Sequence, residues 1–517
     1  MAEAHQSPPT VGSTALAALR RRAHAEAFSW GGGNAGARGS MTAAQVLDAV
    51  GRTQAVFARE GMARGDGVAV LAGNDVDSWI CAVAAWCSGL RLTYLHPRGS
   101  LADHLHQLED AQVRMLVADA AAFGPRAAEL HATAAFDRLV TFRPSDETAA
   151  AVALSEAREQ VGAHRPLDVG APEDVLWLNY TGGTTGRPKG VAYRHRSVLN
   201  HARAILADFE LPNRPRYLAV APITHVAGTK ILPVLHRGGS VHLQNGFRPE
   251  VVLETIARER ISMTLLVPTM VYDLLDAPGL DAADLSSLEL ALYGASPMAL
   301  TRLAEAHTRI GHVFAQLYGQ SECYPISYLP RGEHVAEDPD VLATCGFPVH
   351  GTSVSLRDDA GDEVAPGEAG EICVRALTAM DSYWRRDELT AETLAGGWLH
   401  TGDIGRIDER GLLAIVDRKK DMVVTGGFNV FPREVEDALT RHPEVSAAAV
   451  YGVPDERWGE AVAATVVLRD EGAASADDLR AWVRDLKGAV QAPKTVRFAR
   501  ELPLTPVGKV DKKALRL

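Results

Sequence analysis

Residues 180–190 have the sequence YTGGTTGRPKG and directly follow an apolar run at residues 175–178. The glycines of this stretch let backbone amides turn toward an anion, the threonines add hydroxyl donors, and the lysine adds a positive charge. No GxxxxGK[ST] register fits, so the stretch is not a phosphate loop of that type. A surface linker has no need for this order of glycines and threonines with a Pro-Lys-Gly end. The stretch therefore predicts a phosphate-binding loop formed by Thr181, Gly182, Gly183, Thr184, Thr185, Gly186 and Lys189.

On both sides of this loop, segments with helical and strand periodicity alternate along the chain. Residues 41–60 and 77–87 have the apolar spacing of helices, and residues 67–72 form a short strand-like run. The same alternation predicts strands at residues 113–118, 263–267 and 288–293 and a helix at residues 250–259. Strands separated by helices favour βαβ units and mostly parallel sheets, so we expect an α/β fold.

The pattern of predicted elements changes from about residue 354. Short β-rich pieces at residues 352–356, 370–374 and 412–416 are joined by glycine and aspartate turns. A charged run at residues 417–421 then leads into helical patterns at 432–441 and 475–485 and strand patterns at 447–451 and 461–468. We expect a large N-terminal domain of parallel or mixed sheets with helices and a β-rich subdomain, residues 1–417, in which residues 1–40 are partly flexible. A small mobile α+β domain, residues 418–517, would follow.

Length, charge and cysteine content limit the number of domains, the kinds of partner and the kinds of structural metal site that the sequence allows. A chain of 517 residues is too long for one compact core, which agrees with at least two domains. The formal net charge of −12 argues against a nucleic-acid partner, because duplex binding needs a basic face. The five cysteines form no CxxC pair and leave one over under any pairing, which favours reduced thiols without structural zinc.

Neither a signal peptide nor a membrane span is predicted. Residues 1–10 are polar, and the longest apolar stretch, residues 79–90, is interrupted by a serine and a glycine and is too short to cross a bilayer. That stretch predicts a buried helix, and we expect a soluble, cytoplasmic protein without a membrane partner.

The glycine-rich segment at residues 29–40 contains a formal GxGxxG at Gly31, Gly33 and Gly36. A dinucleotide-binding turn needs a strand before this pattern and a helix that opens at its end. Here a tryptophan precedes the pattern and helical periodicity begins only at Met41, so the segment is interpreted as a flexible loop.

The loop at residues 180–190 resembles the signature loop of the adenylate-forming superfamily, which includes acyl-CoA and aryl-CoA synthetases, luciferases and the adenylation domains of peptide synthetases. Further motifs that resemble those of the family follow in its order along nearly the whole chain. They are the adenine-contacting turn Gly294-Ala295-Ser296-Pro297, the aromatic-acidic motif at 316–322 (QLYGQSE), the ribose motif at 399–403 (LHTGD), the interdomain hinge at 417–421 (DRKKD), the thiol-acceptor loop at 426–430 (GGFNV) and the C-terminal lysine motif at 503–509 (PLTPVGK).

The resemblance implies an enzyme that uses ATP and Mg²⁺ to convert an acid into its adenylate. A carboxylate attacks the α-phosphorus and pyrophosphate leaves, so catalysis is mostly charge neutralisation and alignment. Glu322 would supply a hard oxygen ligand for Mg²⁺, and Lys509 would reach both the attacking carboxylate and the α-phosphate. Tyr318 offers a flat face to the adenine and Gln316 a polar edge, while Asp403 accepts hydrogen bonds from the ribose.

The predicted catalytic residues are Lys509, Glu322, Thr181 and His225. Besides the phosphate loop and the residues above, the predicted nucleotide site takes in Gly294, Ala295, Ser296, Gly319, Gln320, Ser321 and Arg418.

The charged run at residues 418–421 would by itself be a solvated turn. The resemblance implies instead that the small domain rotates there after adenylation, which replaces Lys509 by the acceptor loop. Lys420 is the predicted pivot, and Arg418 a contact to ribose or phosphate. The acceptor loop comprises Gly426, Gly427 and Asn429, and its glycines allow a thiol to approach the backbone closely, which favours CoA as second substrate.

Residues around the predicted substrate pocket favour a small or aromatic polar acid over a long alkyl chain. Lys230 lies in an apolar run, and because an unpaired buried ammonium is costly it must find an anion or reach water. A snorkelling lysine or an internal salt bridge fits as well as a contact to a polar substrate group. Cys323 and Tyr324 replace the small or apolar residues common in relatives of the fatty-acyl type. With His225 they complete the predicted pocket.

Three acceptors fit the same motifs. A free-standing acid–CoA ligase comes first, because residues 221–232 (APITHVAGTKIL) lack the aspartate usual in domains that select α-amino acids and the sequence ends eight residues after Lys509, without a fused carrier domain. A diazotase that adenylates nitrite and transfers the nitrosyl group to an aryl amine comes second. An adenylation enzyme that loads a carrier protein comes third.

Overall fold

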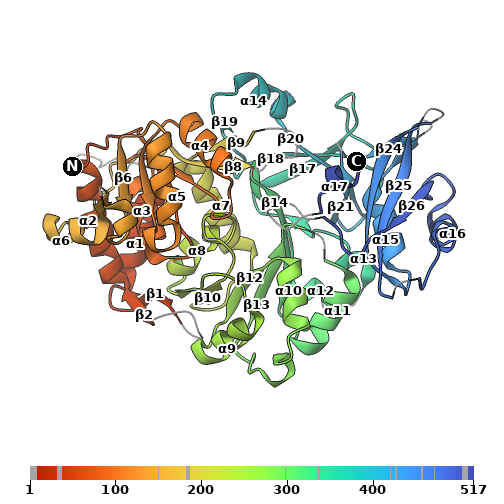
Figure 1. Cartoon of the computed structure of the whole chain (residues 1–517), viewed down its shortest axis with the longest axis horizontal. Helices are drawn as coiled ribbons and strands as arrows, with labels where there is room; N and C mark the ends of the chain where they lie inside the picture. The colour runs from red at the N-terminus through yellow and green to blue at the C-terminus, as the bar shows by residue number, and fades with distance from the viewer. Residues whose placement is uncertain are drawn as a thin grey trace, which may run out of the picture. The chain divides into compact units, whose positions relative to one another are not determined.

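The computed structural model describes residues 8–31, 38–149, 151–181, 187–296, 298–334, 338–419, 421–425, 428–455, 458–470, 472–503 and 510–516. The chain forms two compact units, one of residues 1–353 with 375–397 and one of residues 354–374 with 398–517 (Figure 1). The β-rich segment that precedes the charged run therefore packs with the C-terminal residues. The predicted boundary at residue 417 separates the part of the chain that is expected to rotate from the rest, and it stays a prediction.

The first unit is built on two large sheets. Among the described residues, one sheet runs in the order β16 (Phe347–Pro348), β15 (Cys323–Leu329), β14 (Phe314–Gln320), β13 (Leu290–Gly294), β12 (Met263–Leu266), β10 (Arg216–Ala219), β11 (Ser240–Leu243), β1 (Glu26–Trp30) and β2 (Gly39–Thr42). The other runs β19 (Ser382–Tyr383), β9 (Lys189–Arg194), β8 (Val175–Thr181), β4 (Arg91–Tyr94), β3 (Gly67–Leu71), β5 (Val113–Ala118), β6 (Arg138–Thr141) and β7 (Val152–Ala153). Inner neighbours are parallel, and the pairs at one end of each sheet, β14–β15 and β8–β9, are antiparallel. The α/β fold expected from the sequence is thus confirmed.

Helices cover the faces of both sheets. Helix α7 (His195–Asp208) contacts β9 of one sheet and β15 of the other, while α3 (Val76–Cys87) packs on β3 and β4 and α8 (Ile231–His236) on β10 and β11. Helix α1 (Val11–Arg21) contacts α3, α7 and α8, so a helical layer separates the sheets. Other helices that pack on the first unit's elements are α2 (Ala43–Arg59), α4 (Leu101–Asp110), α5 (Ala120–Thr133), α9 (Pro249–Glu259), α10 (Pro268–Leu275) and α11 (Leu300–Arg309).

Helix α3 is the buried helix predicted from the longest apolar stretch. Asp75 caps its first turn by accepting a hydrogen bond from the backbone N–H of Asp77, and all of its residues except Trp86 are buried. The helix packs in the core because its residues from Trp79 to Cys87 are apolar on every face. No helix in the described part of the chain is long and apolar enough to cross a membrane.

The second unit has two smaller sheets. One has the order β17 (Thr352–Arg357), β18 (Gly370–Ala376), β20 (Leu399–Ile407) and β21 (Leu413–Arg418). The other has the order β23 (Phe428–Val430), β22 (Val423–Thr425), β25 (Gly459–Leu468) and β24 (Val445–Asp455), with β26 (Thr495–Phe498) beside β25. Helices α15 (Pro432–Thr440) and α16 (Ala476–Lys487) pack on one another, and their apolar faces share a core with β24 and β25. The small α+β C-terminal fold is confirmed.

The glycine-rich segment differs from its interpretation in one respect. A strand, β1, does precede it. The sequence does not predict this strand, because it is only five residues long and ends in Trp30. The chain then returns as β2, antiparallel to β1, and α2 opens only after β2. The strand β2 therefore separates the pattern from the next helix. This excludes the arrangement of a dinucleotide-binding turn, in which a helix opens at the end of the glycine pattern. Gly33 and Gly36 themselves lie outside the described residues.

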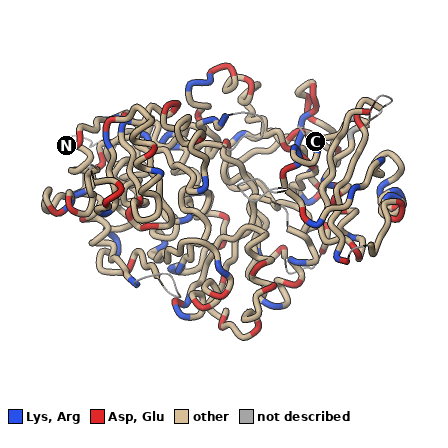
Figure 2. The backbone as a smooth tube through the Cα atoms, viewed as in Figure 1, with Lys and Arg blue, Asp and Glu red and all other residues tan. Residues whose placement is uncertain are grey.

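Charged residues are interspersed over each unit rather than sorted by sign (Figure 2). Many arginines are paired with carboxylates nearby, as in Arg114 with Asp66 and Asp137. The positive charge of Arg114 is thus balanced locally by carboxylates.

Candidate active site

The predicted phosphate loop connects two antiparallel strands. Thr181 ends β8 and Lys189 begins β9, and the two residues are paired across the strands. The loop residues Gly182, Gly183, Thr184, Thr185 and Gly186 lie outside the described part of the chain. Because the chain continues into β9, the next helix, α7, begins only at His195. Any phosphate contact here would come from backbone amides of the loop and from Lys189 rather than from a helix N-terminus.

A buried carboxylate supports the strand that leads into this loop. Asp110 Oδ2 accepts a hydrogen bond of 2.7 Å from the hydroxyl of Tyr180, and its Oδ1 accepts one of 3.0 Å from Arg386. The indole of Trp384 donates to the Asp110 carbonyl at 3.0 Å. Gly190 lies against this group, because a Cβ there would be 3.1 Å from the Tyr180 ring. The base of the loop is therefore fixed by side chains from α4 and from the segment after β19.

The predicted adenine turn lies at the end of β13. Gly294 is the last residue of that strand, and a Cβ at this position would lie 2.4 Å from the carbonyl oxygen of Leu317 on β14, so only glycine allows the two strands this close approach. Ala295 follows with a positive φ of 68°, and Ala295 and Ser296 are exposed. Gln316, half-buried, and Tyr318, buried, lie on β14 beside this turn. The turn and the aromatic-acidic motif are thus neighbours in one sheet.

Glu322 lies in the short turn between β14 and β15, after Gly319, Gln320 and Ser321. Its Oε1 accepts a hydrogen bond of 2.7 Å from the hydroxyl of Tyr383, and its carbonyl accepts one of 2.7 Å from the N–H of Met380. The carbonyl of Ser321 accepts a further bond of 2.7 Å from Tyr193. Burial, and then the charge of Glu322, raise the pKa of Tyr383, so that this hydroxyl stays a donor.

Tyr383 also joins Glu322 to the phosphate hairpin. It pairs with Val191 as part of β19, and the ammonium of Lys189 lies 5.5 Å from the centroid of its ring. The structure therefore brings together Lys189 and Glu322, whose motifs are more than a hundred residues apart, around one tyrosine. A cation near the ring and a carboxylate on its hydroxyl suit a site that handles phosphate and a metal ion.

The residues present fit Mg²⁺. Within the described part of the chain, one oxygen of Glu322 is occupied by Tyr383 and the other has no hydrogen-bond partner, and a carboxylate with one free oxygen beside a phosphate loop is the donor set that Mg²⁺ usually takes. Glu322 is the residue that would hold the ion.

Lys230 and Tyr324, both predicted for the substrate pocket, are in direct contact. The Lys230 amine donates to the hydroxyl of Tyr324, to the Thr229 hydroxyl at 3.0 Å and to the Val226 carbonyl at 3.2 Å. It lies 4.4 Å from the centroid of the Tyr324 ring. Lys230 is fully buried and, within the described residues, has neither the anion nor the water access expected from the sequence. Burial lowers the pKa of Lys230 well below 10.5, because neutral groups replace a counterion.

The other two predicted pocket residues have different surroundings. Cys323 is buried with its Sγ 3.4 Å from the Thr378 hydroxyl, and burial raises the pKa of its thiol to about 12. His225 is half-buried at the turn after β10, where its Nδ1 lies 2.8 Å from the Thr224 hydroxyl and its ring packs edge-on against His96. Burial, and then His96, lower the pKa of His225 to about 4, so it is neutral near pH 7. Their part in binding the substrate stays a prediction.

The second unit carries the predicted ribose and hinge residues. Asp403 on β20 is buried and pairs across the sheet with Arg418 at the end of β21, whose Nε is 3.4 Å from Asp403 Oδ1. Arg418 is exposed, so it can also meet a ligand. Asn429 lies in β23, which pairs with β22. Lys420, Gly426, Gly427 and Lys509 lie outside the described residues, and the chain on the two sides of Lys509 is held together by a bond of 2.7 Å from the Asp511 N–H to the Pro503 carbonyl.

Three supporting residues were missed by sequence reasoning: Asp110, Tyr383 and Trp384. Asp110 ends an amphipathic helix and has no motif around it, so no sequence signal distinguished it. Tyr383 and Trp384 form an aromatic pair between two motifs, and that pair was a usable signal, because adjacent aromatic residues in a polar segment are expected to anchor it to a core.

Comparisons with known proteins were made for the whole chain. Residues 16–384 match the model of the family described as AMP-binding enzyme, and residues 434–509 match the model described as AMP-binding enzyme C-terminal domain. Together the two matches cover most of the chain and include every motif of the first unit up to Tyr383.

Relatives of similar length are named as ligases or synthetases. A medium/long-chain-fatty-acid–CoA ligase of Mycobacterium tuberculosis is 43% identical over 92% of this chain and 85% of its own. A feruloyl-CoA synthase of an Amycolatopsis species is 36% identical over 98% of both chains. Among solved structures, an amide bond synthetase from Marinactinospora thermotolerans is 32% identical, with a TM-score of 0.90 over 98% of this chain and 99% of that one.

Substitution of Tyr383 by phenylalanine should weaken the metal site without loss of the fold. A hydrogen bond to a charged group contributes about 1.5–3 kcal/mol, so the Mg²⁺ concentration needed for half-maximal ATP binding should rise by about 10-fold or more. Calorimetric titration of ATP at several Mg²⁺ concentrations measures this change. Tyr328→Phe is the matched control, since Tyr328 also donates to a glutamate, Glu210, in the same unit. An unchanged Mg²⁺ requirement in Tyr383→Phe would contradict a positioning role.

Substitution of Lys230 by methionine should change how stability depends on pH. An unfolded lysine has its usual pKa of 10.5, whereas the folded one is lower, so the unfolded state binds more protons and the wild type gains stability as pH rises toward 10.5. The variant lacks this contribution. Its advantage in free energy of unfolding should therefore be largest at the lowest pH measured and shrink by up to about 1.4 kcal/mol per pH unit as pH rises toward 10.5. Urea unfolding of both proteins over this range measures the difference, and a constant difference would mean that Lys230 is charged in the folded protein.

Proposed function

Because this chain belongs to the family of AMP-binding enzymes, the adenylate-forming ligases, we propose that it is an acid–CoA ligase that activates a small or aromatic polar acid. The observation that carries the reaction class is the arrangement around Tyr383, with Lys189 near its ring and Glu322 bound to its hydroxyl. Such an arrangement gives the triphosphate of ATP a positive charge and a metal ligand in fixed positions, which adenylation requires.

In the proposed first half-reaction, the substrate carboxylate attacks the α-phosphorus and pyrophosphate leaves. Lys189 and the amides of residues 182–186 hold the phosphates, and Tyr318 and the turn at Gly294 hold the adenine. Lys509 brings the attacking carboxylate to the phosphorus. Mg²⁺, when bound to Glu322, neutralises charge on the phosphate oxygens. Asp403 and Arg418 of the second unit bind the ribose.

CoA is the proposed acceptor in the second half-reaction. The names of two relatives, a fatty-acid–CoA ligase and a feruloyl-CoA synthase, support a thiol acceptor. The proposed rotation about Lys420 would bring Gly426, Gly427 and Asn429 to the adenylate so that the CoA sulfur attacks its carbonyl carbon and AMP leaves. The amide bond synthetase among the structural neighbours makes an amine the acceptor to test beside CoA. A cytoplasmic location stays a prediction.

The contact between Lys230 and Tyr324 supports the substrate class. A buried amine and a phenol that bond to each other and to Thr229 form a polar group inside an otherwise apolar region. An acyl group that ends in a hydroxyl, carbonyl or anionic substituent can share these hydrogen bonds, whereas a plain alkyl chain would gain nothing from them. The two named relatives differ in this respect, since one name gives a fatty acid and the other an aromatic hydroxy acid.

The deciding experiment is a panel of acids assayed for ATP-dependent pyrophosphate release. It contains ferulate-type aromatic acids, small dicarboxylates, medium and long fatty acids, and nitrite, each with CoA, with an amine, or without acceptor. Thioester formation from a polar or aromatic acid supports the proposal. Best turnover with long fatty acids refutes the substrate class, and ATP cleavage driven by nitrite with consumption of an aryl amine refutes the ligase.

Lys230→Met should separate polar from apolar substrates. The substitution keeps the length of the side chain and removes its hydrogen bonds, so kcat/KM for the preferred polar acid should fall by about 10-fold, the value of one good hydrogen bond. The value for a plain fatty acid should stay the same or rise. Lys494→Met, at an exposed lysine, is the control. Equal losses for both kinds of acid would assign Lys230 to the fold rather than to specificity.

Lys509→Ala should reduce adenylate formation by a factor on the order of 100 or more, the scale for removal of one positioned electrostatic group. Pyrophosphate exchange measures this half-reaction alone. Thioester formation from a synthetic acyl adenylate should persist, because the second half-reaction does not use Lys509. Lys513→Ala, at an exposed lysine near the same end of the chain, should behave as the wild type. Near-normal exchange in Lys509→Ala would refute the role.

A further inference from the structure

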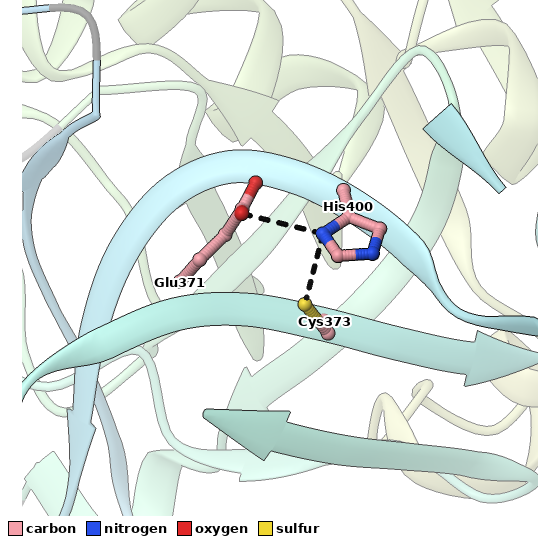
Figure 3. A group of neighbouring side chains, drawn as sticks. All are labelled: Glu371, Cys373 and His400. Carbon is pink, nitrogen blue, oxygen red and sulfur yellow. Dashed lines mark hydrogen bonds and ion pairs between the residues drawn. The ribbon is translucent and has the colours of Figure 1, made fainter. Parts of the chain in front are cut away.

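A cluster of three different metal-ligating side chains lies in the first sheet of the second unit, at the start of the predicted ribose motif and away from the predicted Mg²⁺ ligand Glu322. Glu371 and Cys373 are two residues apart on β18, and His400 is the cross-strand partner of Cys373 on β20. Figure 3 shows the three side chains converging. His400 Nδ1 lies 3.3 Å from Glu371 Oε2 and 3.4 Å from Cys373 Sγ, and all three donor atoms lie within 4.8 Å of one another.

The donor set and its spacing suit a zinc-type cation. A tetrahedral ion with bonds of about 2.0–2.3 Å holds its ligand atoms about 3.3–3.8 Å apart, which is close to the two distances from His400. A thiolate, an imidazole and a carboxylate select borderline ions such as Zn²⁺, Co²⁺ or Cd²⁺, whereas Mg²⁺ prefers oxygen ligands alone. Three protein ligands leave one position for water.

A lysine competes for the same carboxylate. The Lys419 ammonium lies 3.2 Å from Glu371 Oε2, the oxygen that faces His400, and 2.8 Å from Asp359. The other oxygen of Glu371 accepts a bond of 3.1 Å from the Gly402 N–H. Glu371 and Cys373 are buried, and burial raises the pKa of the Cys373 thiol to about 12, so a metal ion must displace both a thiol proton and the ammonium. Lys419 precedes the predicted pivot Lys420, and Gly402 precedes Asp403.

We propose that Glu371, Cys373 and His400 form an inhibitory site for a zinc-type divalent cation, distinct from the Mg²⁺ site. Binding releases the thiol proton to solvent, joins the thiolate, the neutral imidazole and the carboxylate to the ion, and separates Lys419 from Glu371. Glu371 then no longer holds Lys419 in its place before the predicted hinge residue, and of these two partners only Gly402, on its other oxygen, remains. The binding step stands independently of the proposed function, and only the inhibition rests on it.

Binding is tested on the full chain with Co²⁺ as the probe, because a thiolate ligand gives Co²⁺ a charge-transfer band and tetrahedral geometry gives it strong visible absorption. One equivalent of Co²⁺ should produce both signals, and Zn²⁺ should abolish them by displacement. This measurement needs no variant. Absence of a thiolate band, or a spectrum typical of six oxygen ligands, overturns the proposal.

Two variants move the affinity in opposite directions. Cys373→Ser should weaken Zn²⁺ binding by about 10-fold or more, the scale for the loss of a metal-site group, while Cys345→Ser, at a buried thiol of the other unit, should leave it unchanged. Lys419→Met should tighten binding by about 10-fold, because the competing ammonium is gone. Equal affinity in Cys373→Ser and wild type, or no tightening in Lys419→Met, overturns the assignment of the site.

Inhibition is tested by pyrophosphate exchange with Mg²⁺ in excess and free Zn²⁺ buffered. Zn²⁺ should inhibit the wild type at the concentrations that fill the site, a chelator should restore activity, and Cys373→Ser should resist inhibition while it keeps the metal-free rate. Stoichiometric binding without inhibition overturns the inhibitory role. If the wild type exchanges no pyrophosphate with any acid, the proposed function fails, and the Co²⁺ and Zn²⁺ titrations still decide the binding site.

Discussion

The candidate site depends on one short strand that ties two sheets together. β19 has only two residues, yet it pairs with β9 of the phosphate hairpin, and its Tyr383 donates to Glu322 at the tip of β14 and β15. These strands belong to different sheets, and β19, together with the bond from Tyr193 of β9 to the Ser321 carbonyl, sets the separation between the cation of the hairpin and the carboxylate of the other sheet. Catalysis that brings two anions together needs charges whose positions are set before the substrate arrives. The bonds from Met380 to the Glu322 carbonyl and from Tyr193 to the Ser321 carbonyl fix the same turn from the backbone.

A second constraint is the burial of Lys230 among neutral partners. A charged lysine at a fully buried position would need a counterion, and the described surroundings supply a phenol, a hydroxyl and a carbonyl instead. Burial therefore lowers the pKa of Lys230, while the amine keeps its hydrogen bonds. Such a group is costly for folding alone, because a methionine of similar length would fill the same space without loss of a proton. Stability alone therefore does not explain its presence beside Tyr324.

The sequence predicted the fold and most motif positions because those signals are local. Periodicity located β5 at its observed bounds and the other elements that it predicted within a few residues. The motif at residues 316–322 grouped Gln316, Tyr318 and Glu322, which the structure places on and after one strand. Periodicity could not supply the contacts that join motifs. Tyr383 lies 61 residues from Glu322, and Asp110 lies 70 residues from Tyr180, so both contacts depend on how the sheets are assembled. The environment of Lys230 was wrongly expected to contain an anion or water, because sequence spacing does not tell which neutral donors and acceptors surround a buried amine.

In the second unit, the buried carboxylate of Glu371 connects separate segments of the chain, as β19 does in the first unit. Glu371 accepts a hydrogen bond from Gly402, an ion pair from Lys419 and a contact from His400, so it joins the ribose strand to the residue before the predicted pivot. A buried carboxylate is stable only while its partners neutralise it. Any change that removes one partner, whether hinge rotation that displaces Lys419 or a cation that replaces it, must therefore be compensated by the remaining groups. Gly402 and Lys419, which precede the predicted ribose residue and the predicted pivot, therefore share one carboxylate, and a displacement of either changes the electrostatic balance of Glu371.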